Sequence, residues 1–248
     1  MLPSSPLHHL ILHDLGFPVV ATSGNRSEDP ICYREAEVLD RLGGVADGFL
    51  MHDRPIVRPV DDSVVRWVAG RRQVLRRARG WAPLPVELPR RRGAEGAPVV
   101  LGMGTHQKNA VALGVGDRAY LSAHLGDLDT AAARQGFERA MEDLGSVLGV
   151  TPTVAIVDRH PDYHPTQQAI RSFGAGPSGG VVAVSHHAAH VLSAMAEHRL
   201  TGPVLGVAWD GTGLGPDGTL WGGEFLEVTD SGVARVAHWR PFPLPGGE

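Results

Sequence analysis

Apolar positions in the first quarter of the chain switch between helical and strand-like spacing. A helical repeat at 7–15 ends at Gly16, and a second helix is predicted at 34–42. The apolar runs 18–22 and 48–52 are each typical of a strand, and the first run is apolar enough to be buried. This mixture predicts an α/β fold.

The pattern beyond residue 60 predicts a hairpin and then a linker. Apolar residues at 64–68 and 73–75 flank a short turn, as in two paired strands. From 81 to 98 the periodicity is lost among prolines, glycines and three consecutive arginines, a composition typical of linkers. We therefore expect residues 1–82 to form the last part of one domain, 83–97 to form a linker and 98–248 to belong to a second domain.

The second domain reads as a meander followed by alternating helices and strands. Three strand-like segments between 99 and 122 are separated by glycine-rich turns, and a long helix is predicted after Asp129, because apolar residues recur every three or four positions up to Leu148. Further strands are predicted at 154–157, 181–184, 204–209 and 233–239. This alternation favours mixed α/β layers, and the domain could be small or unfinished.

Composition narrows the class of protein. The chain has 248 residues, 42% of them hydrophobic, enough for one large or two modest cores, and its net charge of −4 favours neither nucleic acid nor an anionic membrane. Cys32 is the only cysteine, which excludes an internal disulfide and fits a reducing cytoplasm. The apolar start at 7–15 is too short for a membrane span and lacks a basic leader.

Two histidines and an aspartate form the strongest chemical signal. His186 and His190 are four positions apart on a predicted helix, so their imidazoles share one face, and Asp210 follows a predicted strand directly. Two imidazoles and a carboxylate suit Fe(II) or Zn(II) and leave positions open for substrate. The alternatives are a solvated or helix-capping histidine cluster and an ordinary Asp-Gly turn.

Three polar, glycine-containing segments are candidates for nucleotide contacts. Gly211, Thr212 and Gly213 follow Asp210 and could offer backbone amides to phosphates. The segment 102–109 carries Lys108 and Asn109 between two predicted strands, although its spacing is not that of a P-loop and a polar hairpin fits it somewhat better. The segment 22–25 could contact a nucleotide, but Ser-Gly-Asn is also common turn chemistry. The arginines at 71–79 are better explained as a charged hairpin edge than as a nucleic-acid patch.

Long strings along nearly the whole chain resemble one family. In the first half these are Leu7-His-His-Leu10, Thr22-Ser-Gly-Asn25, Gly43-Gly-Val-Ala-Asp47, His52-Asp-Arg-Pro-Ile-Val-Arg58 and Val60-Asp-Asp-Ser-Val-Val-Arg66. In the second half they are Ser122-Ala-His-Leu-Gly-Asp127, His160-Pro-Asp-Tyr163, His186 to His190, Trp209-Asp-Gly-Thr-Gly213 and Trp221-Gly-Gly-Glu224. They are similar to the HypF family of carbamoyltransferases, first to the end of its YrdC-like domain and then to the first lobe of its actin/sugar-kinase-like (ASKHA) domain.

The resemblance implies a two-step reaction. Carbamoyl phosphate and ATP would form carbamoyl adenylate in the YrdC-like domain, and the kinase-like domain would pass the carbamoyl group to the carboxyl-terminal cysteine of the partner HypE during [NiFe]-hydrogenase maturation. The implied nucleotide-binding residues are Ser23, Asn25, Arg58, Gly211, Thr212 and Gly213. Lys108 and Asn109 would be catalytic, and His186, His190 and Asp210 would hold the iron or zinc.

The departures from the family predict a partial, inactive piece. The acylphosphatase-like domain, the zinc-finger region, the first half of the YrdC-like domain and the second kinase-like lobe have no counterpart in these residues, and Ala188 stands in the third place of a histidine run. Two alternatives remain: a non-catalytic remnant that binds nucleotide or a partner, and a relative of the antibiotic O-carbamoyltransferases with a hydroxyl acceptor.

Overall fold

The computed structural model describes residues 3–26, 29–89, 96–174 and 180–243. The chain divides into two compact units, Met1–Asp61 and Asp62–Glu248. Within the described ranges no helix has the length and hydrophobicity needed to cross a membrane.

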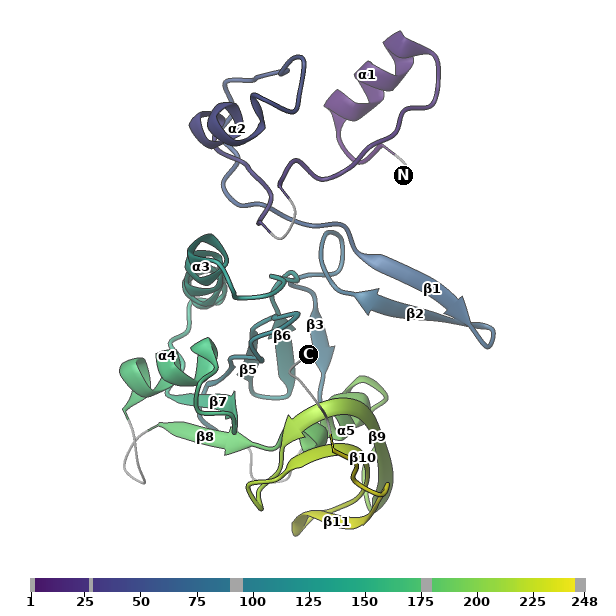
Figure 1. Ribbon diagram of the computed structural model, residues 1–248, viewed down its shortest axis with the longest axis vertical. Helices are drawn as coiled ribbons and strands as arrows, with labels where there is room; N and C mark the ends of the chain where they lie inside the picture. Colours follow the sequence, from purple (N-terminus) through teal and green to yellow (C-terminus); the bar gives the residue numbers. More distant parts are fainter. Residues whose placement is uncertain (1–2, 27–28, 90–95, 175–179, 244–248) are drawn as a thin grey trace. The chain divides into compact units, whose positions relative to one another are not determined.

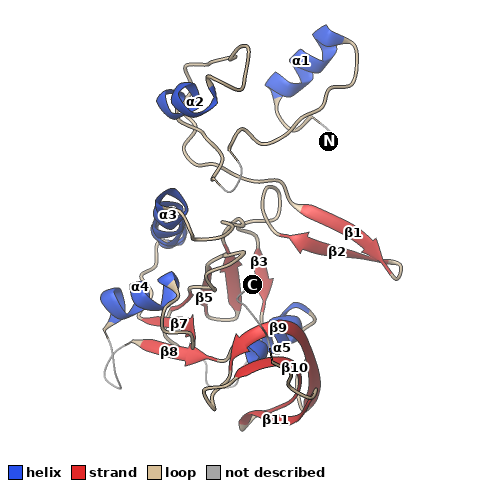
Figure 2. Cartoon of the chain, in the orientation of Figure 1, coloured by secondary structure: helices blue, strands red, loops and turns tan. Residues whose placement is uncertain are grey.

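The first unit contains helices α1 (Pro6–Leu15) and α2 (Glu35–Leu42), both where the sequence predicts them. Helix α1 begins at Ser5, whose hydroxyl accepts a hydrogen bond from the backbone N–H of His8, and ends at Gly16 in the left-handed conformation. Loops make up the remainder of the described residues in this unit (Figure 2).

The two strands predicted for this unit are wrong. Residues 18–22 and 48–52 have no strand pairing, and Val20 is fully exposed. A strand needs a neighbouring strand to satisfy its N–H and C=O groups, and none of the described residues from 3 to 61 forms one. The apolar residues of these two runs favour burial, but no described part of this unit buries them.

The second unit opens with the predicted hairpin. Strand β1 (Val64–Val68) pairs antiparallel with β2 (Arg71–Arg76). The two residues between them, Ala69 and Gly70, both have positive φ, of 49° and 74°, as in a tight turn whose twist matches that of the strands.

A mixed sheet forms the centre of this unit. Its six strands lie in the order β3-β6-β5-β4-β7-β8, with β4, β7 and β8 parallel and the other pairs antiparallel (Figure 1). The strands are β3 (Pro85–Glu87), β4 (Val100–Gly102), β5 (Ala112–Val115), β6 (Arg118–Leu121), β7 (Val154–Asp158) and β8 (Val181–Val184). The predicted meander is thus confirmed as β4, β5 and β6. Strand β3 lies within the stretch whose composition predicts a linker.

Helices α3 (Ala131–Leu148) and α4 (His164–Phe173) cover this sheet. Phe137 and Leu144 of α3 and Ala169 of α4 belong to one buried cluster together with Leu113 and Val157 of the strands. Because both helices contribute to the same cluster, they pack on the same face. The long helix predicted from its apolar repeat is confirmed, with Thr130 as its N-cap.

The parallel arrangement brings three loops to one edge of the sheet. Gly102 of β4 lies opposite Ile156 of β7, and Asp158 at the end of β7 lies opposite Val184 at the end of β8. The carboxyl ends of parallel strands are where ligands commonly bind in α/β folds. The first residue of α5 follows β8 after Ser185 alone, so this helix begins at the same edge.

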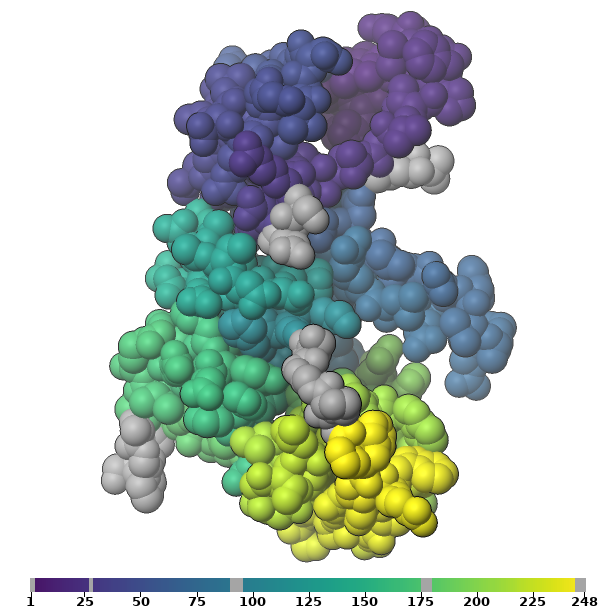
Figure 3. All heavy atoms as spheres, viewed as in Figure 1, coloured from purple at the N-terminus to yellow at the C-terminus, as the bar shows by residue number. Residues whose placement is uncertain are grey.

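A second sheet packs beside helix α5 (His186–Glu197). It consists of β9 (Val204–Leu214), β10 (Leu220–Thr229) and β11 (Gly232–His238), all antiparallel. In the space-filling view its yellow-green and yellow atoms gather beside the teal and green atoms of the first sheet (Figure 3). Strand β9 is longer than predicted, because its pairing with β10 continues past Asp210 as far as Leu214.

Helix α5 approaches β9 so closely that two positions of the strand admit no side chain. A Cβ atom at Gly206 would lie 2.3 Å from a methyl carbon of Val191, and one at Gly213 would lie 2.8 Å from the Cβ of His186. The interface is completed by a small apolar cluster of Ala188, Val191, Ala208, Trp221, Leu226 and Val228.

We expect Gly206→Ala to destabilise the protein by about 1–3 kcal/mol, because the added methyl group overpacks the α5–β9 interface. Gly211→Ala in the same strand is the control, since nothing lies within 4 Å of its added Cβ. Urea unfolding of both variants measures the difference. Equal stabilities would show that α5 and β9 lie farther apart than the structure has them.

Candidate metal centre

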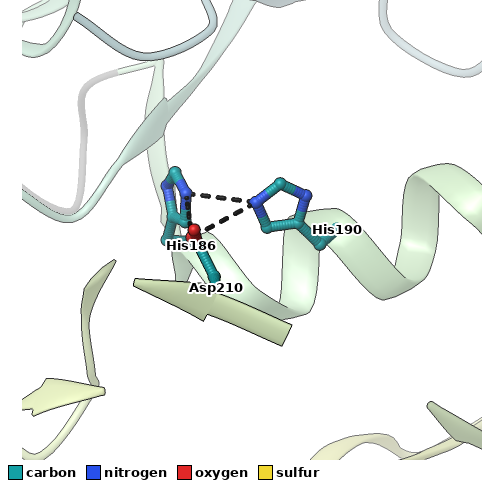
Figure 4. A group of neighbouring side chains, drawn as sticks. All are labelled: His186, His190 and Asp210. Atoms are coloured by element: carbon teal, nitrogen blue, oxygen red, sulfur yellow. Dashed lines mark hydrogen bonds and ion pairs between the residues drawn. The ribbon is translucent and has the colours of Figure 1, made fainter. Parts of the chain in front are cut away.

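Helix α5 places its first residue and the residue one turn later on the same face. His186 begins the helix and its side chain is 20% exposed, whereas His190 is 55% exposed. Residues four apart on a helix are neighbours on its surface, so both imidazoles project toward β9. Figure 4 shows the two rings above Asp210 of that strand.

The side chains of His186, His190 and Asp210 converge on one point, the metal point. The Nε2 atom of His186 lies 2.8 Å from Oδ2 of Asp210, and Nε2 of His190 lies 3.4 Å from the same oxygen. The two Nε2 atoms are 3.2 Å apart. All three atoms thus lie within 4.8 Å of one another, as the sequence led us to expect.

The state of Asp210 indicates what this point could hold. Its Oδ2 atom is buried and accepts no well-aligned hydrogen bond in the described part of the chain, although two imidazoles lie beside it. Its other oxygen accepts the backbone N–H of Gly211 at 2.8 Å. A buried carboxylate oxygen without a donor is costly, and a cation shared with two imidazoles would compensate it. The donor set of two nitrogens and one oxygen fits a divalent transition metal.

Charge around the site favours ionised Asp210. Burial acts to raise the pKa of Asp210, but the Gly211 N–H and the neighbouring histidines outweigh burial and hold this pKa below its usual value. The pKa of His186 is raised, mainly by its hydrogen bond to Asp158, with burial opposing. Asp210 therefore offers an ionised carboxylate where the metal would lie.

Asp158 is a contact that the sequence analysis missed. It ends β7, its side chain is 4% exposed, and its Oδ2 lies 2.8 Å from Nδ1 of His186. The available signal was its position, since it is a carboxylate at the carboxyl end of a predicted strand.

His187 packs into the interface behind the metal point. It is fully buried, its ring centroid lies 6.0 Å from that of Trp221, and neither of its ring nitrogens has a hydrogen-bond partner among the described residues. Burial lowers the pKa of His187, so the ring stays neutral at physiological pH. It acts as a packing group and does not join the three converging atoms.

The loop after β4 is held rigidly by Asn109. This residue is buried, and its amide donates to the carbonyl oxygens of Met103, at 3.0 Å, and Thr105. Lys108 beside it is exposed and has a positive φ of 47°, with its backbone N–H donating to Asp127. Asn109 therefore shapes the loop, while Lys108 is exposed on it.

The remaining predicted nucleotide residues fall into two groups. Gly211, Thr212 and Gly213 lie within β9, directly after Asp210 and not in a separate turn. Ser23, Asn25 and Arg58 belong to the first unit, whereas His186, His190 and Asp210 belong to the second. Ser23 and Arg58 are exposed there, and the Asn25 amide donates to the carbonyl oxygens of Arg26 and Asp29, both at 2.9 Å.

Three protein families match consecutive parts of the chain. The family described as Telomere recombination (Sua5/YciO/YrdC) matches residues 1–78, and the HypF Kae1-like domain matches residues 95–197. The second subdomain of the carbamoyltransferase Kae1-like domain matches residues 206–248.

Individual relatives carry one name. The chain is 49% identical to carbamoyltransferase HypF of Synechocystis and 42% identical to that of Rhodobacter capsulatus, in both cases over its whole length. It spans about a third of these relatives, 31% and 33% of their lengths. The chain is therefore similar to a segment of each relative.

Solved structures agree with the sequence matches. The fold is similar to full-length HypF in a phosphate- and nucleotide-bound form, with a TM-score of 0.86 and 40% identity over 96% of this chain and 36% of that one. It is also similar to HypF of T. kodakarensis, with a TM-score of 0.87 and 35% identity over 100% of this chain and 32% of that one. The α/β architecture joins a YrdC-like part to a Kae1-like, ASKHA-type part, and the chain belongs to the HypF family of carbamoyltransferases.

Proposed function

We propose that this chain carries the metal-dependent transfer site of an ATP-dependent carbamoyltransferase. The observation that carries the proposal is the convergence of His186, His190 and Asp210 around a buried carboxylate oxygen that receives no well-aligned hydrogen bond from the described residues. Carbamoyl phosphate and ATP would give carbamoyl adenylate in the YrdC-like part. The carbamoyl group would then pass to the carboxyl-terminal cysteine of a HypE-like acceptor protein, in the maturation of [NiFe]-hydrogenase.

The three converging residues would hold an iron or zinc ion. Bound there, the ion supplies Lewis-acid polarisation of the carbamoyl oxygen. His186, His190 and Asp210 would supply three of its ligands, and the exposure of His190 would leave the site accessible to substrate. Little proton transfer is needed from the protein, because AMP is already a good leaving group when a thiolate attacks.

Phosphate and nucleotide contacts would come from both units. The nucleotide-bound HypF structure supports the use of ATP, and we assign the adenylation step to Ser23, Asn25 and Arg58. In the transfer step, Gly211, Thr212 and Gly213 would lie beside the nucleotide, next to the metal. For the two proposed catalytic residues, Lys108 would neutralise phosphate charge and Asn109 would fix the loop that carries it.

We expect the 248-residue chain to bind one Zn²⁺ or Fe²⁺ ion. His190→Ala should weaken this binding by roughly a hundredfold, because the binding free energy of structural zinc sites averages about 3 kcal/mol per ligand. His198→Ala is the control, because that exposed histidine caps the other end of α5. Anaerobic calorimetry measures both variants. Equal affinity in the two variants would contradict the assignment of His190 as a ligand.

A second prediction separates the two reaction steps. In a chimera, this chain replaces the aligned third of the Synechocystis relative, and the double change His186→Ala, His190→Ala is introduced. We expect carbamoylation of the acceptor cysteine to be abolished, because the metal is lost. Pyrophosphate release from ATP with carbamoyl phosphate should continue, because it depends on the first unit.

Acceptor carbamoylation is followed by mass spectrometry and pyrophosphate by a coupled assay, with His198→Ala as the control chimera. Transfer at the parental rate in the double variant would refute the metal role. Loss of both reactions together would refute the division of the two steps between the units.

A further inference from the structure

Asp158 uses both carboxylate oxygens, and each has its own partner. Its Oδ1 accepts the backbone N–H of His160 at 2.9 Å, and its Oδ2 lies 2.8 Å from Nδ1 of His186. Its backbone carbonyl accepts the hydroxyl of Thr166 at 3.2 Å. With a side chain only 4% exposed, Asp158 is fixed in place before any metal arrives.

This arrangement determines which nitrogen of His186 carries the proton. A carboxylate only accepts hydrogen bonds, so the close contact requires a hydrogen on Nδ1. Both ring nitrogens face a carboxylate, but of these two described contacts only the one to Asp158 has the geometry of a hydrogen bond. When the ring is neutral, its single N–H therefore stays on Nδ1 and the lone pair lies on Nε2. Nε2 is the atom that lies 2.8 Å from Asp210 and 3.2 Å from Nε2 of His190.

We propose that Asp158 is a positioning residue that holds His186 in its Nδ1–H tautomer and so presents the Nε2 lone pair to the metal. The proposal rests on the proposed metal site, because the lone pair has this use only if an ion binds there. Asp158 itself is not a ligand, since its oxygens are occupied by His160 and His186. No comparable partner is described for His190, so only one of the two imidazoles is fixed in this way.

Asparagine at position 158 provides a sharp test. Its side chain offers one oxygen and one NH₂ group, whereas the two partners of Asp158 are both donors. If the oxygen keeps the backbone N–H of His160, the NH₂ group must donate to Nδ1 of His186. The imidazole proton then moves to Nε2 and blocks the metal point. Aspartate and asparagine are nearly equal in size, so packing is conserved.

The experiment compares the 248-residue chain with its Asp158→Asn and Asp162→Asn variants. Asp162 is an exposed carboxylate on the same loop, so its loss removes equal charge without touching His186. Long-range ¹⁵N–¹H spectra of the metal-free proteins, recorded at increasing pH until the His186 ring is neutral, report the tautomer of His186. The His186 signals are assigned from their absence in His186→Gln. Zn²⁺ titration by calorimetry gives the affinity.

We expect the Nδ1–H tautomer in the parent chain and in Asp162→Asn, and the Nε2–H tautomer in Asp158→Asn. Zn²⁺ affinity should fall about 10- to 100-fold in Asp158→Asn alone, the usual effect of losing a partner of a ligand. An Nε2–H tautomer in the parent would overturn the proposal whether or not the variant folds. Unchanged affinity in a folded Asp158→Asn would also overturn it. Absence of Zn²⁺ binding by the parent, with the Nδ1–H tautomer still seen, would instead refute the proposed function.

Discussion

Helix α5 lies so close to strand β9 that Gly206 and Gly213 leave no room for a side chain. This contact sets the distance between the imidazoles and Asp210, because the histidines begin the helix and the aspartate lies between the two glycines. The apolar cluster around Val191 maintains the same spacing along the rest of the interface. The close approach of the two backbones therefore determines how far apart the three side chains of the metal point lie.

His186 also connects the two sheets of the second unit. One of its nitrogens faces Asp158, the last residue of β7 in the mixed sheet, and the other faces Asp210 of β9 in the antiparallel sheet. A shift of either sheet would therefore alter the ring's position. The ring of His186 is thus held from two sides, by Asp158 and by Asp210.

Sequence periodicity was sufficient to predict those helices and strands whose packing partners lie among the described residues. The i, i+4 spacing of His186 and His190 correctly predicted a shared face, and the apolar repeat of α3 predicted its packing. It failed at 18–22, because an apolar run predicts a strand only when another strand pairs with it. It also missed Asp158, since the hydrogen bond to His186 spans 28 positions and depends on how β7 and β8 align. The roles of Lys108, Ser23 and Arg58 remain predictions.

The order of His186, His190 and Asp210 along the chain has a consequence for folding. Helix α5 and strand β9 are consecutive elements, so bringing them together closes only a short loop and costs little chain entropy. Strand β4 pairs instead with β7, with two strands and the long helix α3 between them in the sequence, and such nonlocal pairing is intrinsically slower. We therefore expect the helix and strand that carry His186, His190 and Asp210 to associate early, and the anchor from β7 to be added when the mixed sheet closes.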